Sequence, residues 1–519
     1  MAVTPTYPGV YIEELPSSAR TITAAPTSIT VFVGYTHPFK TRQFEAAVQI
    51  FNFSDYEREF GGHYSSGEVL SDVSLAVEQF FGNGGSNAYV VGLKAQYRDA
   101  TGAVLAPGDL SAPSATIGGI IFSAREPTDR VAMEVTINNL RQTTSANDTA
   151  DITITCGTSV ETFRGVTLIA SDANFIESRL GVPGAELSSL VTIAPAGADY
   201  GVAFTAASET PLTAAPPAGF AGTFSPADFT NVFQADSSLD KVQIFNLLVL
   251  PGIADNAIWS RALAFCEGKR AFMILDPPVQ AAADDSSAPL TKIQDMLNIV
   301  PPSANAALYF PYMQGQDPVT NTAIDVAPSG FLAGIYARTD LNRGVWKAPA
   351  GLEATLRGTV GVVARGRMTD MRQGVLNPKG VNCIRSFPGI GSVVFGARTV
   401  VTENPAYQPW RYVPVRRMAL FIEQTLYANL GWAVFEPNDN PLWIALRTTV
   451  ENFMLGLFNQ GAFQGSKPSE AFLVKCDSST TTQSDIDNGI VNIIVGFRPL
   501  KPAEFVIVKI SQLAGQVQA

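Results

Sequence analysis

Histidines, cysteines and paired carboxylates build most catalytic and metal sites, and this sequence places few of them in usable patterns. Its two histidines, His37 and His63, show no HExxH or HxH spacing, so a zinc hydrolase or a histidine-based triad is not supported. The acidic pairs Asp284–Asp285 and Asp485/Asp487 stand in polar segments, where charges are more often solvated than bound to a metal. We therefore predict no catalytic residue and no metal site.

Two glycine-rich segments could be taken for nucleotide loops. "GNGGSN" at 82–87 follows an expected helix and precedes an expected strand, whereas a dinucleotide loop needs the opposite order. "GAFQGSK" at 461–467 has the wrong spacing for a phosphate-binding loop, and Pro468 follows its lysine. We predict that both segments are turns and that the chain binds no cofactor.

The net charge of −11 is unevenly distributed. Residues 101–240 contain 15 Asp/Glu and 5 Lys/Arg, whereas residues 343–417 contain 12 Lys/Arg and 3 Asp/Glu. Such blocks can be solvated faces that keep a protein soluble. They can also indicate an acidic face toward solvent and a basic face toward an acidic partner. The basic residues are dispersed and no RNP-like aromatic motif accompanies them, so we expect no direct binding of nucleic acid.

The cellular setting follows from cysteine usage and hydropathy. The four cysteines are far apart and form no CxxC pair, which is typical of reduced structural thiols. No run approaches the ~18 apolar residues of a membrane span, and no signal peptide is visible. We expect folding in a cytoplasm and no insertion into a membrane.

The apolar pattern predicts an α/β body. Five short runs are apolar enough to be buried on both faces, as in a parallel sheet. They are 29–36, 88–93, 245–252, 271–278 and 307–313. Helical patterns at 71–81 and 256–269 alternate with them, which favours an α/β layer.

The remaining segments predict further domains. Residues 101–230 are rich in Ala, Gly, Pro, Ser and Thr and contain alternating β-like pieces, which indicates an inserted β-rich outer domain. After about 345, two helical patterns and two strand-like runs indicate an α+β domain. The expected divisions are an N-terminal arm (1–22), the body (23–100 and 231–344), the insertion (101–230), the C-terminal domain (345–502) and a C-terminal arm (503–519).

Both ends of the sequence carry a short β-prone run fenced by prolines. These runs hold Val10, Tyr11 and Ile12 at one end and Phe505, Val506, Ile507, Val508 and Ile510 at the other. An unpaired apolar strand is an aggregation hazard unless it has a designated partner, such as the sheet edge of another molecule. If both ends added strands to different neighbours, the contacts would not close and a helical polymer would form. Alternatively, each end folds back onto its own domain.

The motifs along the chain resemble those of contractile tail sheath proteins of bacteriophages and related injection systems. The resemblance is carried by "YPGVYIEE" (7–14), "PSGFLAGIYARTDLNRGVWKAPAG" (328–351), "GVNCIRSFPGIGSVVFGARTV" (380–400), "WRYVPVRRMALFIEQTL" (410–426), "FEPNDNPLW" (435–443) and "GFRPLKPAEFVIVKI" (496–510). It covers the N-terminal arm and almost everything after about 240. The segment 101–230 carries no such motif.

The resemblance implies a structural protein rather than an enzyme. Subunits of this family form stacked hexameric rings around an inner tail tube, with baseplate and tail terminator proteins at the ends. Terminal arms exchange strands between neighbours, and contraction drives the tube through a cell envelope. The implied location is the virion tail, after assembly in the host cytoplasm. We expect the 345–502 domain to face the tube, with Arg411, Arg416 and Arg417 as candidate contacts.

Two alternatives stay open at this point. One is a static helical or shell-forming structural protein that does not contract. The other is an α/β enzyme with a glycine-rich ligand loop.

Overall fold

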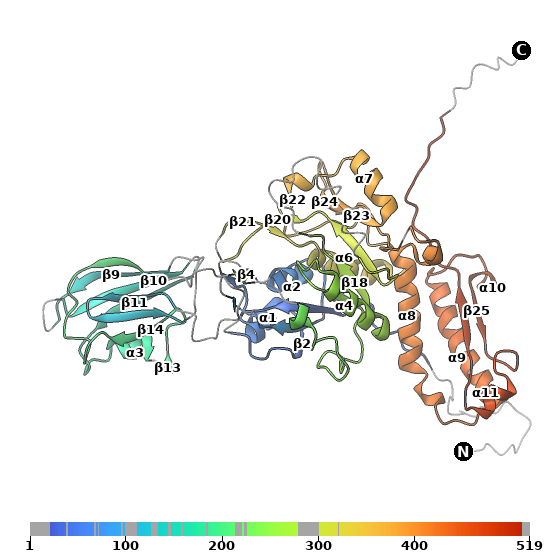
Figure 1. Ribbon diagram of the computed structural model, residues 1–519, viewed down its shortest axis with the longest axis horizontal. Coiled ribbons are helices and arrows are strands. Elements are labelled where there is room, and N and C mark those ends of the chain that lie inside the picture. Colours follow the sequence, from blue (N-terminus) through green and yellow to red (C-terminus); the bar gives the residue numbers. More distant parts are fainter. Residues whose placement is uncertain are drawn as a thin grey trace, which may run out of the picture. The chain divides into compact units, whose positions relative to one another are not determined.

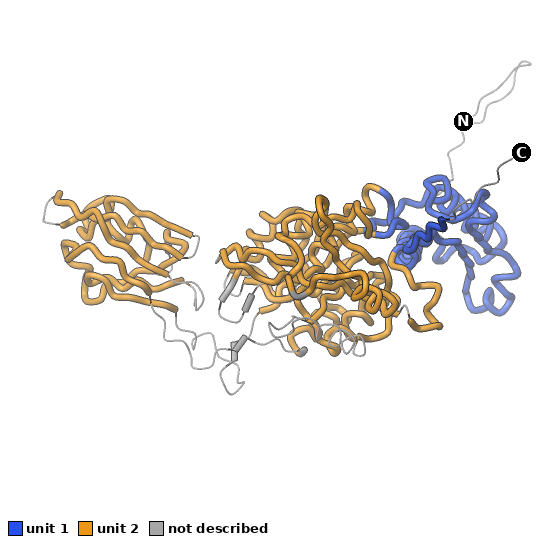
Figure 2. The backbone as a smooth tube through the Cα atoms, turned by 90° about the horizontal axis from the view of Figure 1, so that it is seen from above, with its two compact units in different colours: residues 1–27, 343–348, 414–519 blue, residues 28–342, 349–413 orange. Residues whose placement is uncertain are grey.

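The chain divides into two compact units, which are described separately. The computed structural model describes the chain outside residues 1–20, 38–39, 67–68, 71, 95–96, 99–111, 126–132, 144–146, 157–158, 183–184, 213–220, 223–225, 279–299, 320, 402 and 511–519. Unit 1 comprises residues 1–27, 343–348 and 414–519, and unit 2 comprises residues 28–342 and 349–413 (Figure 2).

An eight-stranded sheet forms the centre of unit 2. Its order is β2 (Ala47–Ile50), β5 (Ala88–Leu93), β1 (Thr30–Tyr35), β17 (Leu247–Val249), β18 (Phe272–Leu275), β19 (Ala306–Phe310), β23 (Val381–Phe387) and β24 (Gly391–Val394). All neighbouring pairs are parallel except those made by the edge strands β2 and β24. Every residue of β1 is buried. The five predicted strands are thus confirmed as a parallel sheet.

Helices cover both faces of this sheet (Figure 1). The ring of Phe32 on β1 packs against Phe80 of α2 (Asp72–Gly82). Its neighbours Val31 and Val33 share a core with Trp259 of α4 (Asn256–Lys269). Because successive strand residues point to opposite faces, α2 and α4 lie on opposite sides of the sheet. Both helices confirm the predicted patterns.

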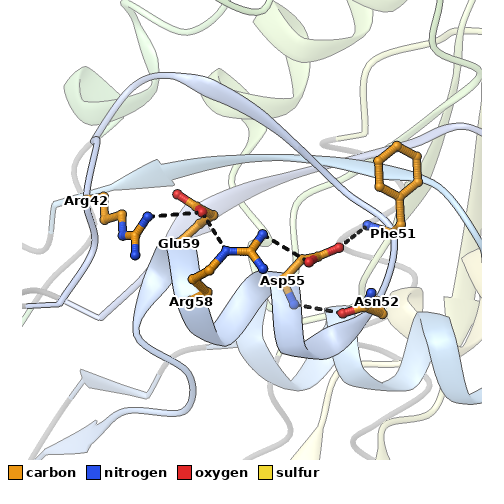
Figure 3. Close-up of polar contacts among 6 residues, drawn as sticks. All are labelled: Arg42, Phe51, Asn52, Asp55, Arg58 and Glu59. Atoms are coloured by element: carbon orange, nitrogen blue, oxygen red, sulfur yellow. Dashed lines mark hydrogen bonds and ion pairs between the residues drawn. The ribbon is translucent and has the colours of Figure 1, made fainter.

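Helix α1 (Phe53–Phe60) shows how local chemistry sets an element boundary (Figure 3). The Asn52 side chain accepts a hydrogen bond from the backbone N–H of Asp55 at 2.8 Å. In return, the Asp55 carboxylate accepts one from the N–H of Phe51 at 3.1 Å. Arg58 forms ion pairs with both Asp55 and Glu59 at 3.0 Å. The Asn52 contact satisfies one of the open N–H groups at the start of the helix, and the Asp55 contact fixes the residue before the cap.

Unit 2 contains one further long helix, α6, and several short elements. They are α6 (Ser329–Arg343, whose last residue falls in unit 1), α7 (Asp370–Leu376), β3 (Ser65–Ser66), β4 (Val69–Leu70), β6 (Tyr97–Arg98), β16 (Ala221–Gly222), β20 (Met313–Gln316), β21 (Ala323–Val326), β22 (Gly361–Val362), and the 3-10 turns η2 (Pro226–Phe229), η3 (Ala364–Gly366), η4 (Asn377–Lys379) and η5 (Pro405–Trp410).

The inserted segment is β-rich, as predicted. One sheet has the order β11 (Ser159–Thr167), β10 (Thr149–Cys156), β9 (Met133–Arg141) and β15 (Ser208–Leu212). A second has the order β14 (Val191–Pro195), β8 (Ile120–Ala124) and β7 (Ser114–Ile117). The short α3 (Ile176–Leu180), β12 (Gly181–Val182) and β13 (Ala185–Glu186) complete it. Both sheets contribute alternate residues to one separate core, which is typical of two packed sheets.

Unit 1 is an α+β fold. It holds α8 (Val413–Asn429, which begins at the last residue of unit 2), η6 (Gly431–Ala433), α9 (Asn440–Asn459), α10 (Pro468–Ala471), β25 (Phe472–Lys475), α11 (Gln483–Asp487) and β26 (Ile494–Phe497). Met418 of α8, Val450 of α9 and Val474 of β25 share its main core. The division differs from the predicted start of this domain at 345, because β23 pairs with β19 and so extends the sheet of unit 2.

Candidate assembly surfaces

The C-terminal run is an exposed apolar chain. Phe505, Val506, Ile507, Val508 and Ile510 are 73%, 85%, 81%, 75% and 92% exposed. These residues lie in neither a helix nor a strand of the single chain (Figure 1). The corresponding residues of the other end, Val10, Tyr11 and Ile12, lie outside the described residues. Exposure of these five apolar side chains to water is unfavourable in an isolated subunit. Full burial of each would contribute roughly 1.5–3 kcal/mol of free energy.

A two-stranded sheet in unit 1 offers edges for strand addition. β25 and β26 pair antiparallel, from Phe472 opposite Phe497 to Lys475 opposite Ile494. Val474 is buried against the helices, whereas Leu473 and Ile494 are 57% and 52% exposed. A sheet of two strands is marginal by itself, and each strand leaves one edge without a strand partner among the described residues. Sequence reasoning predicted the two strands but did not identify them as an acceptor.

The segment behind the N-terminal arm is fixed along α8. The backbone of Thr23 exchanges two hydrogen bonds with the side-chain amide of Asn429, at 3.0 and 2.9 Å. The N–H of Ala25 donates to Thr425 Oγ1 at 3.1 Å. The guanidinium of Arg417 donates to the carbonyl of Thr27 at 2.9 Å, and Arg417 is only 4% exposed. These contacts fix residues 23–27 against α8.

The three predicted tube-facing arginines have different surroundings. Arg416 on α8 forms an ion pair with Glu423 at 3.3 Å. Arg411 belongs to unit 2 and lies over the ring of Tyr412 at 5.6 Å. Arg417 donates a hydrogen bond to the carbonyl of Thr27, as described above. Arg416 and Arg417 both belong to α8, whereas Arg411 precedes it.

The described residues contain no cluster of three or more His, Cys, Asp or Glu side chains that could hold a metal ion. No helix in the described part of the chain is long and apolar enough to cross a membrane. His63 lies 2.9 Å from Ser74 Oγ and 3.5 Å from Glu78, and burial lowers the pKa of His63. Ser74 is only 1% exposed, whereas the side chain of Glu78 is 44% exposed.

Two neighbouring acidic residues, the buried Asp276 after β18 and the half-buried Asp72 at the start of α2, were not predicted. The Asp276 carboxylate accepts hydrogen bonds from the N–H of Gly252 at 3.0 Å and from the N–H and hydroxyl of Ser329 at 2.9 and 2.5 Å. It thereby caps the start of α6. A Cβ on Gly252 would lie 2.6 Å from a carboxylate oxygen of Asp72. Burial raises the pKa of Asp72 to about 7 and that of Asp276 to about 6. Asp276 thereby connects the end of β18 to the start of α6. The sequence feature that could have predicted it is an Asp directly after an apolar strand.

Comparison with known proteins assigns the chain to a family. The family model for the phage tail sheath protein central domain matches residues 234–400, and the model for the phage tail sheath C-terminal domain matches residues 406–512. Together these ranges cover more than half of the chain. A relative from Pseudomonas aeruginosa, named as a prophage major tail sheath protein, is 28% identical over 264 residues. That alignment covers 50% of this chain and 62% of the relative.

Solved structures agree over nearly the whole chain. A chain of the anti-feeding prophage helical sheath in the contracted state is 25% identical with a TM-score of 0.57, covering 98% of this chain and 100% of that chain. A chain of the anti-feeding prophage baseplate is also 25% identical, with a TM-score of 0.57 and coverage of 98% and 99%. The sheath of an extracellular contractile injection system, at 23% identity, a TM-score of 0.60 and 99% coverage of both chains, shows the same fold. The chain belongs to the phage tail sheath protein family.

Proposed function

We propose that this chain is the structural subunit of a contractile sheath, which polymerises as stacked hexameric rings around an inner tail tube. The observation that carries this proposal is the exposed apolar run Phe505–Ile510 in a chain whose unit 1 holds an open-edged two-stranded sheet. The similarity to the helical sheath of the anti-feeding prophage supports the assembly type.

Strand addition supplies the connections between subunits. Residues 505–510 of one copy would add to one edge of the β25–β26 sheet in a second copy, and Val10–Ile12 of another copy would add to the other edge. Main-chain hydrogen bonds then provide affinity, while alternate side chains fill apolar positions. Because donor and acceptor are different surfaces, the contacts are heterologous and generate a helix rather than a closed dimer.

The sheath would act mechanically, without catalysis or a cofactor. An extended and a contracted sheath are two packings of the same subunits, and the transition between them releases stored free energy. The strand mesh keeps the subunits connected while the units move. The partners are the tail tube, the baseplate and a tail terminator protein, and the sheath belongs to a virion tail assembled in the host cytoplasm. Contraction would drive the tube through the target envelope.

Electron microscopy of the purified full-length chain tests this proposal. We expect the wild-type chain to form wide hollow tubes, and a variant with Val506→Pro and Val508→Pro to stay soluble and unpolymerised. Each proline removes a backbone N–H group with which the added run can pair and fixes the backbone φ angle at that position. A second variant with Val10→Pro and Ile12→Pro is expected to behave in the same way.

The control variant Lys509→Ala changes the same run but keeps its N–H groups, so it should form tubes. Tubes from both proline variants would contradict the strand-exchange proposal. A static polymer, the alternative function, would keep one diameter, whereas a contractile sheath assembled on a tube and baseplate should widen and shorten when triggered.

A further inference from the structure

The loop between α8 and α9 displays an aromatic side chain to solvent. Phe435 is fully exposed, and its φ of +70° lies in the left-handed region that residues other than glycine seldom adopt. Its neighbour Val434 is 61% exposed. Backbone strain and an exposed aromatic ring are both unfavourable in the single chain. Local strain of this kind persists where the surrounding structure fixes it, and such positions gather at binding sites.

The surrounding structure does fix this loop. The side-chain oxygen of Asn438 accepts a hydrogen bond from Trp443 Nε1 at 2.9 Å, and its Nδ2 donates to the carbonyl of Ile490 at 3.0 Å. The next residue, Asp439, caps α9 by accepting the N–H of Leu442 at 3.2 Å. These contacts hold the C-terminal side of the loop, and the N–H of Val434, which donates to the carbonyl of Gly431 at 3.3 Å, holds its N-terminal side. A rigid aromatic anchor loses little conformational entropy on binding, which favours a role as a binding hot spot.

The segments that pack beside the Phe435 loop are acidic in sequence. Neither 431–446 nor 477–497 contains a Lys or Arg. The two segments lie together, because Ile486 of α11 packs in one cluster with Trp432 and Ala433. Their acidic side chains are Glu436, Asp439, Asp477, Asp485 and Asp487. Glu436 directly follows Phe435, so the anchor has an acidic neighbour.

A surface with the complementary character lies on unit 2. We call it the α7 patch; its exposed apolar members are Met371 (85%), Val375 (42%), Ile390 (44%) and Phe395 (38%). Helix α7 is tied to the edge of the sheet, since Gln373 Nε2 donates to the carbonyl of Phe395 at 2.7 Å and accepts Arg385 through its Oε1 at 3.0 Å. Residues 351–395 contain six Lys/Arg and two Asp/Glu. On α7, Arg372 is next to Met371, while Asp370 is paired with Arg385 at 2.7 Å, so the net side-chain charge beside the patch is positive.

We propose that Phe435 of one copy docks onto the α7 patch of a second copy. The inference rests on the proposed function, because it takes the second copy from the same polymer. Apolar surfaces with oppositely charged rims match each other and repel copies of themselves. The contact joins two different surfaces, so it is heterologous and propagates rather than closing. It differs from strand exchange in depending on side chains rather than on main-chain hydrogen bonds.

The test measures the critical concentration for polymerisation of the full-length chain by sedimentation. Phe435→Ala should raise it at least ~10-fold, which corresponds to about 1.4 kcal/mol for one contact. The control Ile444→Ala removes another exposed apolar side chain of unit 1, which is 46% exposed on α9, and should change it less than ~3-fold. Glu436→Lys and Arg372→Glu should each weaken polymerisation, and the double variant should restore most of the loss, because the swapped charges attract again.

Several outcomes would overturn the proposal. Polymerisation of Phe435→Ala at the wild-type concentration would do so, as would a double charge-swap variant that is weaker than either single variant. A Phe435→Ala variant that polymerises normally alone but fails on the tail tube would assign the anchor to the tube instead. If the proline variants of the C-terminal run abolish polymers and Phe435→Ala does not, the proposed function stands and this inference fails. A wild-type chain that stays monomeric at every concentration would overturn both.

Discussion

At the scale of single residues, the acidic residues Asp72 and Asp276 predict a pH-dependent stability. Burial, with the charge of Asp276 as the second cause, raises the pKa of Asp72 from 3.8 to about 7. An acid whose pKa is raised by folding stabilises the fold fully below its unfolded pKa. That stability is lost as the pH rises through the folded pKa.

Asp72→Asn removes this loss, because the amide does not ionise. We expect the variant to be more stable than the wild type. The gain should be about 2 kcal/mol larger at pH 8.5 than at pH 5.5, because the wild type loses stability over the roughly 1.5 pH units between pH 5.5 and the folded pKa of about 7. Urea unfolding of unpolymerised protein at both pH values measures the difference. An equal change at both would show that Asp72 ionises in the folded chain as it does in the unfolded chain.

At the scale of elements, α6 and α2 approach each other so closely that only glycine fits between them. A Cβ on Gly334 would lie 2.6 Å from the backbone oxygen of Phe80, and one on Gly330 would lie 2.5 Å from Ala76 Cα. Backbone atoms cannot rotate away as a side chain can. Gly334→Ala should therefore push the helices apart and cost about 2–3 kcal/mol in the free energy of unfolding.

Gly456 supplies the matched control. It lies inside α9, where an added Cβ meets no atom within 4 Å. Gly456→Ala should raise stability by roughly 0.5–1 kcal/mol, because alanine is the better helix former and restricts the unfolded chain. Both variants can be compared by thermal unfolding. A Gly334→Ala variant as stable as the wild type would mean that the two helices are not in tight contact.

The apolar pattern predicted these elements well and their partners less well. The predicted runs at 88–93 and 256–269 coincide with β5 and α4. Both elements depend on local sequence, since β5 is a continuous apolar run and α4 begins after the capping residue Asp255. The membership of β23 in the sheet of unit 2 was missed, since it depends on pairing with β19 across a long stretch of chain. The exposure of Phe435 and the short distance between Asp72 and Gly252 were not predicted either. Both depend on tertiary contacts, which a local sequence pattern does not indicate.

At the scale of the whole molecule, the basic block at 343–417 left two interpretations open, a solvated face or a face toward an acidic partner, and its arginines have different contacts in the structure. Arg417 fixes the segment behind the N-terminal arm through the carbonyl of Thr27. Arg385 pairs with Asp370 at 2.7 Å and lies over the rings of Phe387 and Phe395. We infer that positive charge in this block serves folding at some positions and assembly at others. For Arg416, paired with Glu423, the two roles can be separated by experiment.

Arg416→Glu places two acidic side chains together on α8, so by itself it would weaken assembly through either role. The double variant Arg416→Glu and Glu423→Arg keeps an ion pair of reversed direction, which preserves the contact within the helix. If Arg416 faces an acidic tail tube, both variants should assemble on the tube at least ~10-fold less efficiently than the wild type, while tube-free polymerisation of the double variant stays normal. If the ion pair is structural, the double variant should recover both activities. Quantifying sheathed tubes by electron microscopy, with and without the tube protein, separates these results, because only a tube contact makes the sign of the charge matter after the pair has been restored.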